Sequence, residues 1–380
     1  MNPLQMVDLK SQYQRIKPQI DNAIQGVIDS CQFVKGAEVK TFEQELAQYL
    51  GVRHAIACGN GTDALQVALM ALGLKPGDEV ITTDFTFIAT VEVIALLGLK
   101  PVLVDVDMAT FNIDVEKVEK AITPRTKAIV PVHLFGQCAN MEPLLKLAEK
   151  HGLYVVEDTA QGLGAEYRFS DGTVRKAGTI GTIGCTSFFP SKNLGCYGDG
   201  GALFTNDDQL AEQIRCLTNH GMKVRYHHDM IGVNSRLDTI QAAILRVKLP
   251  HLDEYNRARL VAAEKYNAAL SGIAGLETPV TAAFTTHIFH QYTLKVKNGQ
   301  RDALKKHLDE HGIPNMVYYP IPLHRQKAFE PYVAENDSFP VSETICGEVL
   351  SLPMHTELDD EQIERITSAV RSFFEKGQKG

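Results

Sequence analysis

The sequence lacks any long apolar run: no stretch of twenty consecutive apolar residues occurs in its 380 residues. A transmembrane helix needs about that length, so a membrane protein is not predicted. The polar start Met1–Lys10 does not fit a signal peptide. Basic runs are also missing and the net charge is −8, which argues against nucleic acid as a partner. We therefore expect a soluble, cytoplasmic protein.

Metal-binding and disulfide patterns are missing as well. The seven cysteines include no Cys-x-x-Cys pair, which favours small buried hydrophobic residues in a reducing compartment. The only adjacent histidines, His227 and His228, lie among charged residues, so a solvated loop is a better interpretation than a metal site. We expect no metal.

Short apolar runs alternate with amphipathic helices in the first half of the chain. Strands are predicted at 54–58, 79–82, 102–106, 128–132 and 154–157, and helices at 62–72, 88–97, 115–121 and 141–151. This alternation predicts an α/β fold with a mostly parallel sheet covered by helices on both faces. Such sheets bind ligands at the carboxyl ends of their strands, so the loops after the strands are the place to look for a site.

Length and a hydrophobic content of 44% suggest two domains. A helical arm over Ser11–Ser30, broken near Pro18, opens the larger domain, residues 1–250. Pro250 then begins a long helix to Leu270, and residues 251–380 form a smaller α+β domain with strand-like runs at 291–296 and 316–319. A hairpin is predicted over 165–178.

A lysine stands alone in a glycine-rich loop, Ser187–Gly201, between two apolar runs. Pro190 and the glycines hold Lys192 in a tight turn, and the aromatic residues before it indicate a partly dry pocket. A desolvated lysine loses its proton more readily, and its neutral amine can attack a carbonyl. A solvated surface lysine is the alternative, because short motifs often match by chance.

Two further loops follow predicted strands. Gly59–Leu65 leads into a helix, whose free N–H groups and glycines suit an anion, and Thr62 adds a hydroxyl; an ordinary N-cap with turn glycines is the alternative. Asp158 ends an apolar strand, where a carboxylate is costly unless it meets a cation or a protonated ring nitrogen. A helix cap or a structural salt bridge would also explain Asp158.

One ligand, pyridoxal 5′-phosphate, fits all three loops. Its aldehyde and phosphate arm sit on neighbouring ring positions, so one loop can supply Lys192 for the aldehyde and Ser187 for the phosphate. Gly61 and Thr62 add hydrogen-bond donors to the phosphate, and Asp63 in the same loop is also predicted to bind the cofactor.

The cofactor ring would be held by other strands. Asp158 can keep the ring nitrogen protonated, which makes the cofactor a strong electron sink. Gln161 can hydrogen-bond the ring hydroxyl, and Phe87 can stack on the ring face.

Five motifs occur in an order that resembles the DegT/DnrJ/EryC1/StrS family of nucleotide-sugar aminotransferases, over nearly the whole chain. They are Asn60-Gly61-Thr62-Asp63-Ala64-Leu65, Glu157-Asp158-x-Ala160-Gln161, Ser187-Phe188-Phe189-Pro190-Ser191-Lys192, Gly198-Asp199-Gly200-Gly201 and Gly232-x-Asn234-x-Arg236. The resemblance implies fold type I of the pyridoxal-phosphate enzymes, with residues 1–250 binding the cofactor, and a homodimer with active sites at the subunit interface.

The same resemblance implies roles for single residues. Lys192 would be the Schiff-base lysine and Asp158 the partner of the ring nitrogen. Gln161 would contact the ring oxygen, and Thr62 and Ser187 the phosphate. Asn234 would reach the phosphate from the neighbouring subunit.

The lysine loop is most similar to that of enzymes that aminate the 3-keto group of UDP-N-acetyl-3-keto-glucuronic acid, with L-glutamate as the family's usual amino donor. Arg236 is the candidate for the substrate's acid group, since arginine binds carboxylates in a bidentate fork, although an intersubunit salt bridge would explain it equally well. Tyr319 and His324 are further candidates for substrate contact. The hairpin arm Arg168–Arg175 is longer than the family leads us to expect.

Three alternatives stay open. The substrate could be a neutral dTDP- or UDP-linked keto-deoxysugar. A sugar dehydratase of the same family is disfavoured, because those relatives carry histidine in place of Lys192. A non-catalytic sensor or regulator would need an effector or nucleic-acid module, and the sequence offers neither a basic patch nor an appended domain.

Overall fold

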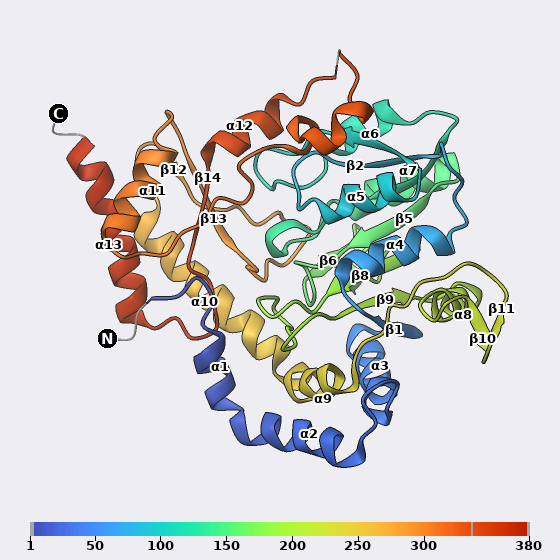
Figure 1. The fold of residues 1–380 in the computed structure, drawn as a ribbon. Coiled ribbons are helices and arrows are strands. Elements are labelled where there is room, and N and C mark those ends of the chain that lie inside the picture. Colours follow the sequence, from blue (N-terminus) through green and yellow to red (C-terminus); the bar gives the residue numbers. More distant parts are fainter. Residues whose placement is uncertain (1–3, 336, 378–380) are drawn as a thin grey trace.

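A seven-stranded sheet forms the centre of the computed structural model, which describes residues 4–335 and 337–377 (Figure 1). The strand order is β1-β9-β8-β5-β4-β2-β3. The strands are β1 (His54–Cys58), β2 (Glu79–Thr83), β3 (Lys100–Val104), β4 (Thr126–Val130), β5 (Tyr154–Asp158), β8 (Ile183–Ser187) and β9 (Gly201–Thr205). Only β9 runs antiparallel to its neighbours in this sheet, so the predicted mostly parallel α/β sheet is confirmed.

Helices cover both faces of this sheet (Figure 1). They include α4 (Gly61–Ala71), α5 (Ala89–Leu96), α6 (Val115–Ala121), α7 (Met141–His151), α8 (Asp208–Leu217) and α9 (Thr239–Lys248). Because successive side chains on a strand point to opposite faces, Val80 packs in the cluster under α4, α5 and α8, whereas Ile81 packs in the cluster under α6 and α7. Both faces are therefore buried.

The N-terminal arm is the broken helix that the sequence predicts. It consists of α1 (Leu9–Arg15) and α2 (Lys17–Ser30), followed by α3 (Ala37–Leu50). The break falls at Ile16, and Pro18 lies in the first turn of α2, where its missing N–H group costs no helical hydrogen bond.

A second hydrophobic core lies in the C-terminal part of the chain, and Leu4 from the N-terminal end packs into it. It is formed by α10 (Leu252–Leu270), β12 (Leu276–Glu277), β13 (Tyr292–Val296), α11 (Arg301–Glu310), β14 (Val349–Leu352) and α13 (Asp360–Gly377), with α12 (Pro340–Glu348) packed beside it. The strand predicted at 316–319 is wrong: only Met316 pairs, in a single bridge to Ser351. The domain boundary at residue 250 stays a prediction.

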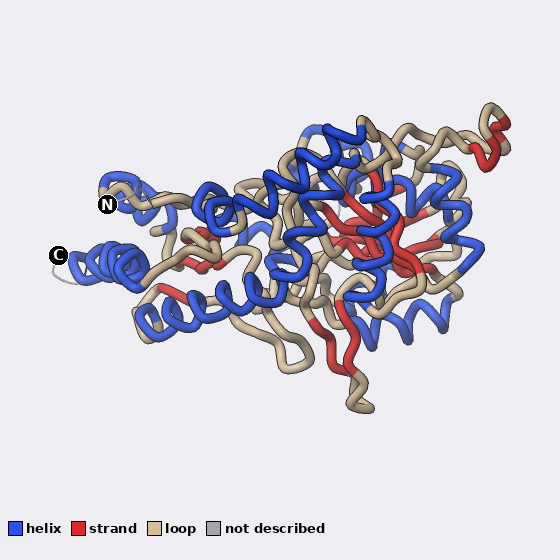
Figure 2. Tube along the Cα trace, turned by 90° about the horizontal axis from the view of Figure 1, so that it is seen from below, coloured by secondary structure: helices blue, strands red, loops and turns tan. Residues whose placement is uncertain are grey.

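Two hairpins complete the fold. The predicted one is formed by β6 (Glu166–Arg168) and β7 (Val174–Lys176). The other, β10 (Met222–Val224) and β11 (His227–His228), extends from the body at the right of Figure 2. His227 and His228 are exposed as expected, but they pair with β10 instead of forming a loop.

Candidate active site

A cavity of about 680 Å³ lies beside the carboxyl ends of β5 and β8, where a parallel sheet is expected to bind its ligand. Many of the predicted site residues line it: Gly61, Thr62, Asp63, Phe87, Asp158, Gln161, Ser187, Lys192 and Tyr319. The fold therefore brings together side chains from both halves of the chain.

The start of α4 forms one wall of this cavity. Asn60 caps the helix by accepting a hydrogen bond from the Asp63 N–H group at 2.8 Å. A side chain at position 61 would place its Cβ 2.6 Å from the Cβ of Ser187, so only glycine lets the helix end approach β8 this closely. The free N–H groups of the first turn, together with the hydroxyls of Thr62 and Ser187, form a cradle of the kind that binds phosphate.

Lys192 follows β8 and faces the same cavity. Burial lowers its pKa from 10.5 to about 8, although the negative charge of Asp158 acts in the opposite direction. At pH 7 about a tenth of this amine is therefore neutral, far more than for a lysine with an ordinary pKa, and the neutral form is the one that nucleophilic and proton-transfer roles require.

Asp158 is fixed by two hydrogen bonds. The hydroxyl of Thr90 on α5 donates to Oδ2 at 2.7 Å, and the N–H group of Ala160 donates to Oδ1 at 3.1 Å. Thr90 is buried and was not predicted, because only the fold brings α5 to the end of β5. The arrangement holds the carboxylate in one orientation toward the cavity.

The neighbouring Glu157 points away from the cavity, into the protein. It accepts hydrogen bonds from the N–H groups of Gly178, Ile180 and Gly181 and lies 2.8 Å from His133 Nε2. Burial opposes its ionisation, but these hydrogen bonds prevail and lower its pKa. Glu157 thus anchors the loop before β8, while Asp158 serves the cavity.

Gln161 has its amide orientation fixed by two partners. Its Oε1 accepts from the Phe135 N–H group at 2.8 Å, and its Nε2 donates to the Tyr319 hydroxyl at 3.1 Å. Burial raises the pKa of Tyr319, so its hydroxyl stays protonated. The ring of Phe87 lies 6.3 Å from that of Tyr319 and is half exposed, which leaves an aromatic face available to a ligand.

Three further residues on the cavity wall were not predicted: His290, Gln291 and Tyr318. His290 contacts the lysine loop, because its Nδ1 lies 3.1 Å from Asn193 Oδ1. These residues lie 98, 99 and 126 positions from Lys192 in the sequence and carry no motif, so only the fold could reveal them.

His324 lies outside this cavity wall. Its Nδ1 lies 2.7 Å from Asp84 Oδ2 and its Nε2 lies 3.2 Å from Glu343 Oε1, and the ring stacks on Phe339. Both ring nitrogens already face carboxylates. In this arrangement His324 ties the loop after β2 to the C-terminal part of the chain instead of facing a ligand.

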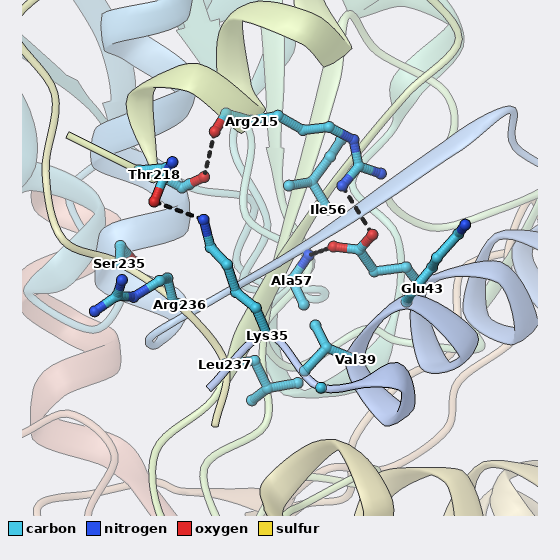
Figure 3. A pocket seen from close by; sticks show the side chains of 13 residues that line it. Lys35, Val39, Glu43, Ile56, Ala57, Arg215, Thr218, Ser235, Arg236 and Leu237 are labelled. Carbon is cyan, nitrogen blue, oxygen red and sulfur yellow. Dashed lines mark hydrogen bonds and ion pairs between the residues drawn. The ribbon is translucent and has the colours of Figure 1, made fainter. Parts of the chain in front are cut away.

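Arg236 lines a second cavity, of about 400 Å³, whose walls come from α3, β1 and the end of α8 (Figure 3). Figure 3 shows it extending away from the ion pair between Arg215 and Glu43. Burial and the charge of Arg236 lower the pKa of Lys35, which lines the same cavity. In the described part of the chain, no hydrogen bond or ion pair reaches the Arg236 guanidinium, and the nearby Asn234 side chain is exposed.

The hydroxyl of Ser235 links residues that line the two cavities. Ser235 Oγ accepts from the Gly59 N–H group at 2.9 Å and donates to Asp63 Oδ2 at 2.6 Å. Asp63 lines the cavity of Lys192, and Ser235 lines that of Arg236. Within one chain, Arg236 and Lys192 therefore do not share a cavity.

The residues around Lys192 fit pyridoxal phosphate. The glycine at position 61 brings the start of α4 close to Ser187, so the helix N–H groups and the Ser187 hydroxyl lie on the same cavity and can bind a phosphate group together. Asp158 is a fixed carboxylate for a ring nitrogen, and the desolvated Lys192 amine suits an aldehyde.

Other site types find no support. None of the described helices has the length and apolar character needed to cross a bilayer. Over residues 4–335 and 337–377, no group of three or more histidine, cysteine, aspartate or glutamate side chains is arranged to hold a metal ion.

Comparison with known proteins gives the same family over nearly the whole chain. The chain is 47% identical over 367 residues to a UDP-2-acetamido-2-deoxy-3-oxo-D-glucuronate aminotransferase of Pseudomonas aeruginosa, covering 97% of this chain and 99% of the relative. It is also 47% identical over 371 residues to a protein of Geobacillus stearothermophilus named pleiotropic regulatory protein, covering 97% and 98%.

A solved structure agrees with these sequences. The crystal structure of DesV from S. venezuelae in complex with a ketimine intermediate superposes with a TM-score of 0.94 at 42% identity, covering 99% of both chains. The model of the DegT/DnrJ/EryC1/StrS aminotransferase family matches residues 14–371. The chain belongs to the DegT/DnrJ/EryC1/StrS aminotransferase family.

Proposed function

We propose that the protein is a pyridoxal-phosphate-dependent transaminase that moves the amino group of L-glutamate to a keto group of a nucleotide-linked sugar. The observation that carries this proposal is a desolvated lysine, Lys192, in one cavity with the fixed carboxylate of Asp158 and the anion cradle at the start of α4. Relatives named as sugar aminotransferases, at 40–47% identity, support the substrate class.

Each residue has a defined task in this reaction. The helix start at Gly61, with Thr62 and Ser187, holds the cofactor phosphate, and Asp158 holds a proton on the ring nitrogen. When bound, pyridoxal phosphate supplies an electron sink for the negative charge that develops on the amino donor. Lys192 Nζ takes the proton from the donor's Cα and returns a proton when the keto-sugar is aminated, which its pKa of about 8 allows near neutral pH.

A UDP-linked 3-keto N-acetyl-glucuronic acid is the proposed substrate, and cell-surface polysaccharide or lipopolysaccharide synthesis the proposed purpose. The relative from Pseudomonas aeruginosa supports this choice, whereas DesV and the dTDP-3-amino-3,4,6-trideoxy-glucose transaminase of Streptomyces venezuelae favour a neutral deoxysugar. The guanidinium of Arg236, which has no carboxylate partner in the described part of the chain, would bind the carboxylate of this substrate.

We further propose a homodimer in which each subunit completes the partner's active site. The exposed Asn234 and the separate cavity of Arg236 support this, because neither side chain serves the Lys192 cavity of its own chain. Location in the cytoplasm is proposed as well. It is supported by seven unpaired cysteines, which suit a reducing compartment.

A panel of nucleotide-linked keto-sugars tests the function. When glutamate is added, the enzyme loaded with pyridoxal phosphate should lose its absorbance band at about 420 nm, a position that follows from the chemistry of a protonated Schiff base. It should then aminate the keto-uronate, detected by product mass. Lys192→Ala is the control and should abolish turnover. Substantial amination by that variant, or no amination of any sugar by the wild type, would refute the assignment.

A regulatory protein is the second candidate, because one relative at 47% identity bears that name. Such a protein needs no proton-transferring lysine, and the position of Lys192 in one cavity with Asp158 and the anion cradle favours catalysis instead. A wild type whose absorbance band disappears with glutamate, but which aminates no sugar, would favour the regulator.

A further inference from the structure

Two loops on the wall of the Lys192 cavity are joined to each other at their far ends. The loop 84–88, after β2, carries Phe87 on the cavity wall, and the loop 317–322 carries Tyr318 and Tyr319. Neither loop contains helix or strand, so its shape depends on side-chain contacts. The ring of Tyr319 lies 6.3 Å from that of Phe87, so a shift of either loop changes the same part of the cavity.

Asp84 and His324 make the join. Asp84 Oδ1 accepts from the His324 backbone N–H group at 2.7 Å, and Oδ2 lies 2.7 Å from His324 Nδ1. The Asp84 carbonyl accepts from the Leu323 N–H group at 3.0 Å, and the Asp84 N–H group donates to the Val104 carbonyl at 2.9 Å. Residue 84 is therefore fixed to β3 on one side and to residues 323 and 324 on the other.

The join is buried, which makes it costly to break. Asp84 is fully shielded from solvent, and His324 is buried as well. Burial raises the pKa of Asp84, and the contacts with His324 act in the opposite direction. A buried carboxylate that loses a donor must move or take up a proton. Loss of the His324 side chain would therefore displace the loop after β2.

The link between His324 and the cavity is short and stiff. Pro320 and Pro322 lie between His324 and Tyr319, and each proline fixes one backbone dihedral angle. At the cavity, the Tyr319 hydroxyl accepts from Gln161 Nε2 at 3.1 Å. A displaced His324 would thus move Tyr319 relative to Gln161, which is expected to contact the cofactor ring.

A second carboxylate joins the sheet to the C-terminal part of the chain, but away from the cavity. Asp105, after β3, accepts from the N–H groups of Val341 at 2.9 Å and Ser342 at 2.8 Å. The buried Ser342 hydroxyl also donates to Asp105 Oδ1 at 2.7 Å. Asp105 and Ser342 lie outside the wall of the Lys192 cavity. Ser342 therefore offers a contact of the same kind for comparison.

From this geometry we propose that the Asp84–His324 pair positions Phe87 and Tyr319 against the cofactor ring. Phe87 follows Asp84 by three residues and Tyr319 precedes His324 by five, so the pair fixes the far end of both loops. His324 acts here through other side chains and is a positioning residue. The kinetic consequences rest on the proposed function, whereas the order of the two loops can be measured without cofactor.

Two substitutions of His324 test the proposal. His324→Leu removes the contact with Asp84 Oδ2, whereas the amide nitrogen of His324→Asn can take the place of Nδ1 and restore it. In the protein without cofactor, hydrogen exchange followed by mass spectrometry should be about tenfold faster over residues 84–90 and 317–324 in His324→Leu. The exchange of His324→Asn should stay near that of the wild type.

The enzyme loaded with pyridoxal phosphate gives a second readout. Per loaded site, His324→Leu should lose about 10- to 100-fold in kcat, because misplaced ring contacts affect both half-reactions. Its KM for glutamate should change less than about threefold, since the pair lies outside the cavity wall. His324→Asn should recover most of kcat.

Ser342→Ala is the matched control. It removes a buried contact between the sheet and the C-terminal part of the chain, and it should leave kcat and the exchange of both loops unchanged. An equal loss of kcat in this control would overturn the proposal, as would wild-type exchange over both loops in His324→Leu. Restored exchange without restored kcat in His324→Asn would also overturn it, because the loss would then follow the imidazole instead of the loops.

The test also holds if His324→Leu does not fold. His324→Phe, which keeps a ring against Phe339, then takes its place with the same expected results. Failure of the proposed function is seen separately, as a wild type whose absorbance band does not respond to glutamate. In that case the exchange data still decide whether the pair orders the two loops.

Discussion

Lys248 offers a direct test of how much a buried charge lowers the stability of this fold. Its cationic side chain is buried, and no carboxylate partner is found for it among the described residues. It is 1% exposed on α9, donates to the Gly195 carbonyl at 2.5 Å and lies over the ring of Tyr197. Burial lowers its pKa from 10.5 to about 8. We predict that Lys248→Met stabilises the fold near neutral pH.

The magnitude follows from the pKa. Below pH 8 the folded protein carries a charged, desolvated ammonium, at a cost of about 3 kcal/mol for a pKa lowered by about 2.5. The variant removes this cost but also loses the hydrogen bond to Gly195, which stabilises the wild type by about 1 kcal/mol. The free energy of unfolding of the variant should therefore exceed that of the wild type by about 2 kcal/mol at pH 7. Above pH 10.5 the lysine is neutral in both states and the gain disappears.

Denaturant unfolding of both proteins at equal concentration measures this effect. Between pH 7 and pH 9.5 the advantage of the variant should fall by about 2 kcal/mol, because the unfolded lysine stays protonated while the folded one does not. Lys306→Met, on the exposed face of α11, is the control and should show no such pH dependence. A destabilised Lys248→Met at pH 7, or an advantage that does not change with pH, would refute the reasoning. Turnover should nevertheless drop, since Gly195 belongs to the loop of Lys192.

Three further predictions concern the active site. Asp158→Asn should lower kcat far more than cofactor affinity, because the amide cannot hold the ring nitrogen protonated; wild-type kinetics would make Asp158 structural. Thr90→Val should slow turnover about tenfold through the lost hydrogen bond, and Thr90→Ser should restore it, with the pH dependence of the cofactor absorbance as a second readout. Mixing Lys192→Ala with Asn234→Ala subunits should regenerate activity in hybrid dimers, and hybrids no more active than their parents would exclude donation across the interface.

The sequence predicted the strand and helix order better than the strand limits. The bounds of β1, α6 and α7 agree with the prediction, but β3 and β4 begin two residues earlier than their apolar runs. Apolar runs report burial, and Val106 and Val132 remain buried beyond the ends of β3 and β4, where each forms only an isolated bridge. Polar residues such as Thr126 can begin a strand, so its start is hidden from a hydrophobicity pattern.

Site residues divide in the same way. Short local motifs predicted Lys192, Asp158 and the loop at Gly61 as site residues, and the structure places them on one cavity. Thr90 acts only through Asp158, 68 positions away, and such a contact leaves no local signal. Tertiary contacts of a predicted residue are equally hidden from the sequence: both ring nitrogens of His324 lie against carboxylates, and its predicted role in substrate contact stays a prediction.

The long helix α10 has a mechanical consequence. Near its start, Asn256 bonds the lysine loop; in the middle, the Arg259 guanidinium donates to the carbonyls of Phe289, His290 and Met354; near its end, Tyr266 lies in the second hydrophobic core. Figure 1 shows α10 extending from beside α9 toward α11 and α13, and bending this helix would break these buried hydrogen bonds. We therefore expect α10 to resist a hinge motion that separates the two cores, because such a motion would cost these hydrogen bonds, and we expect substrate to enter by movement of surface loops.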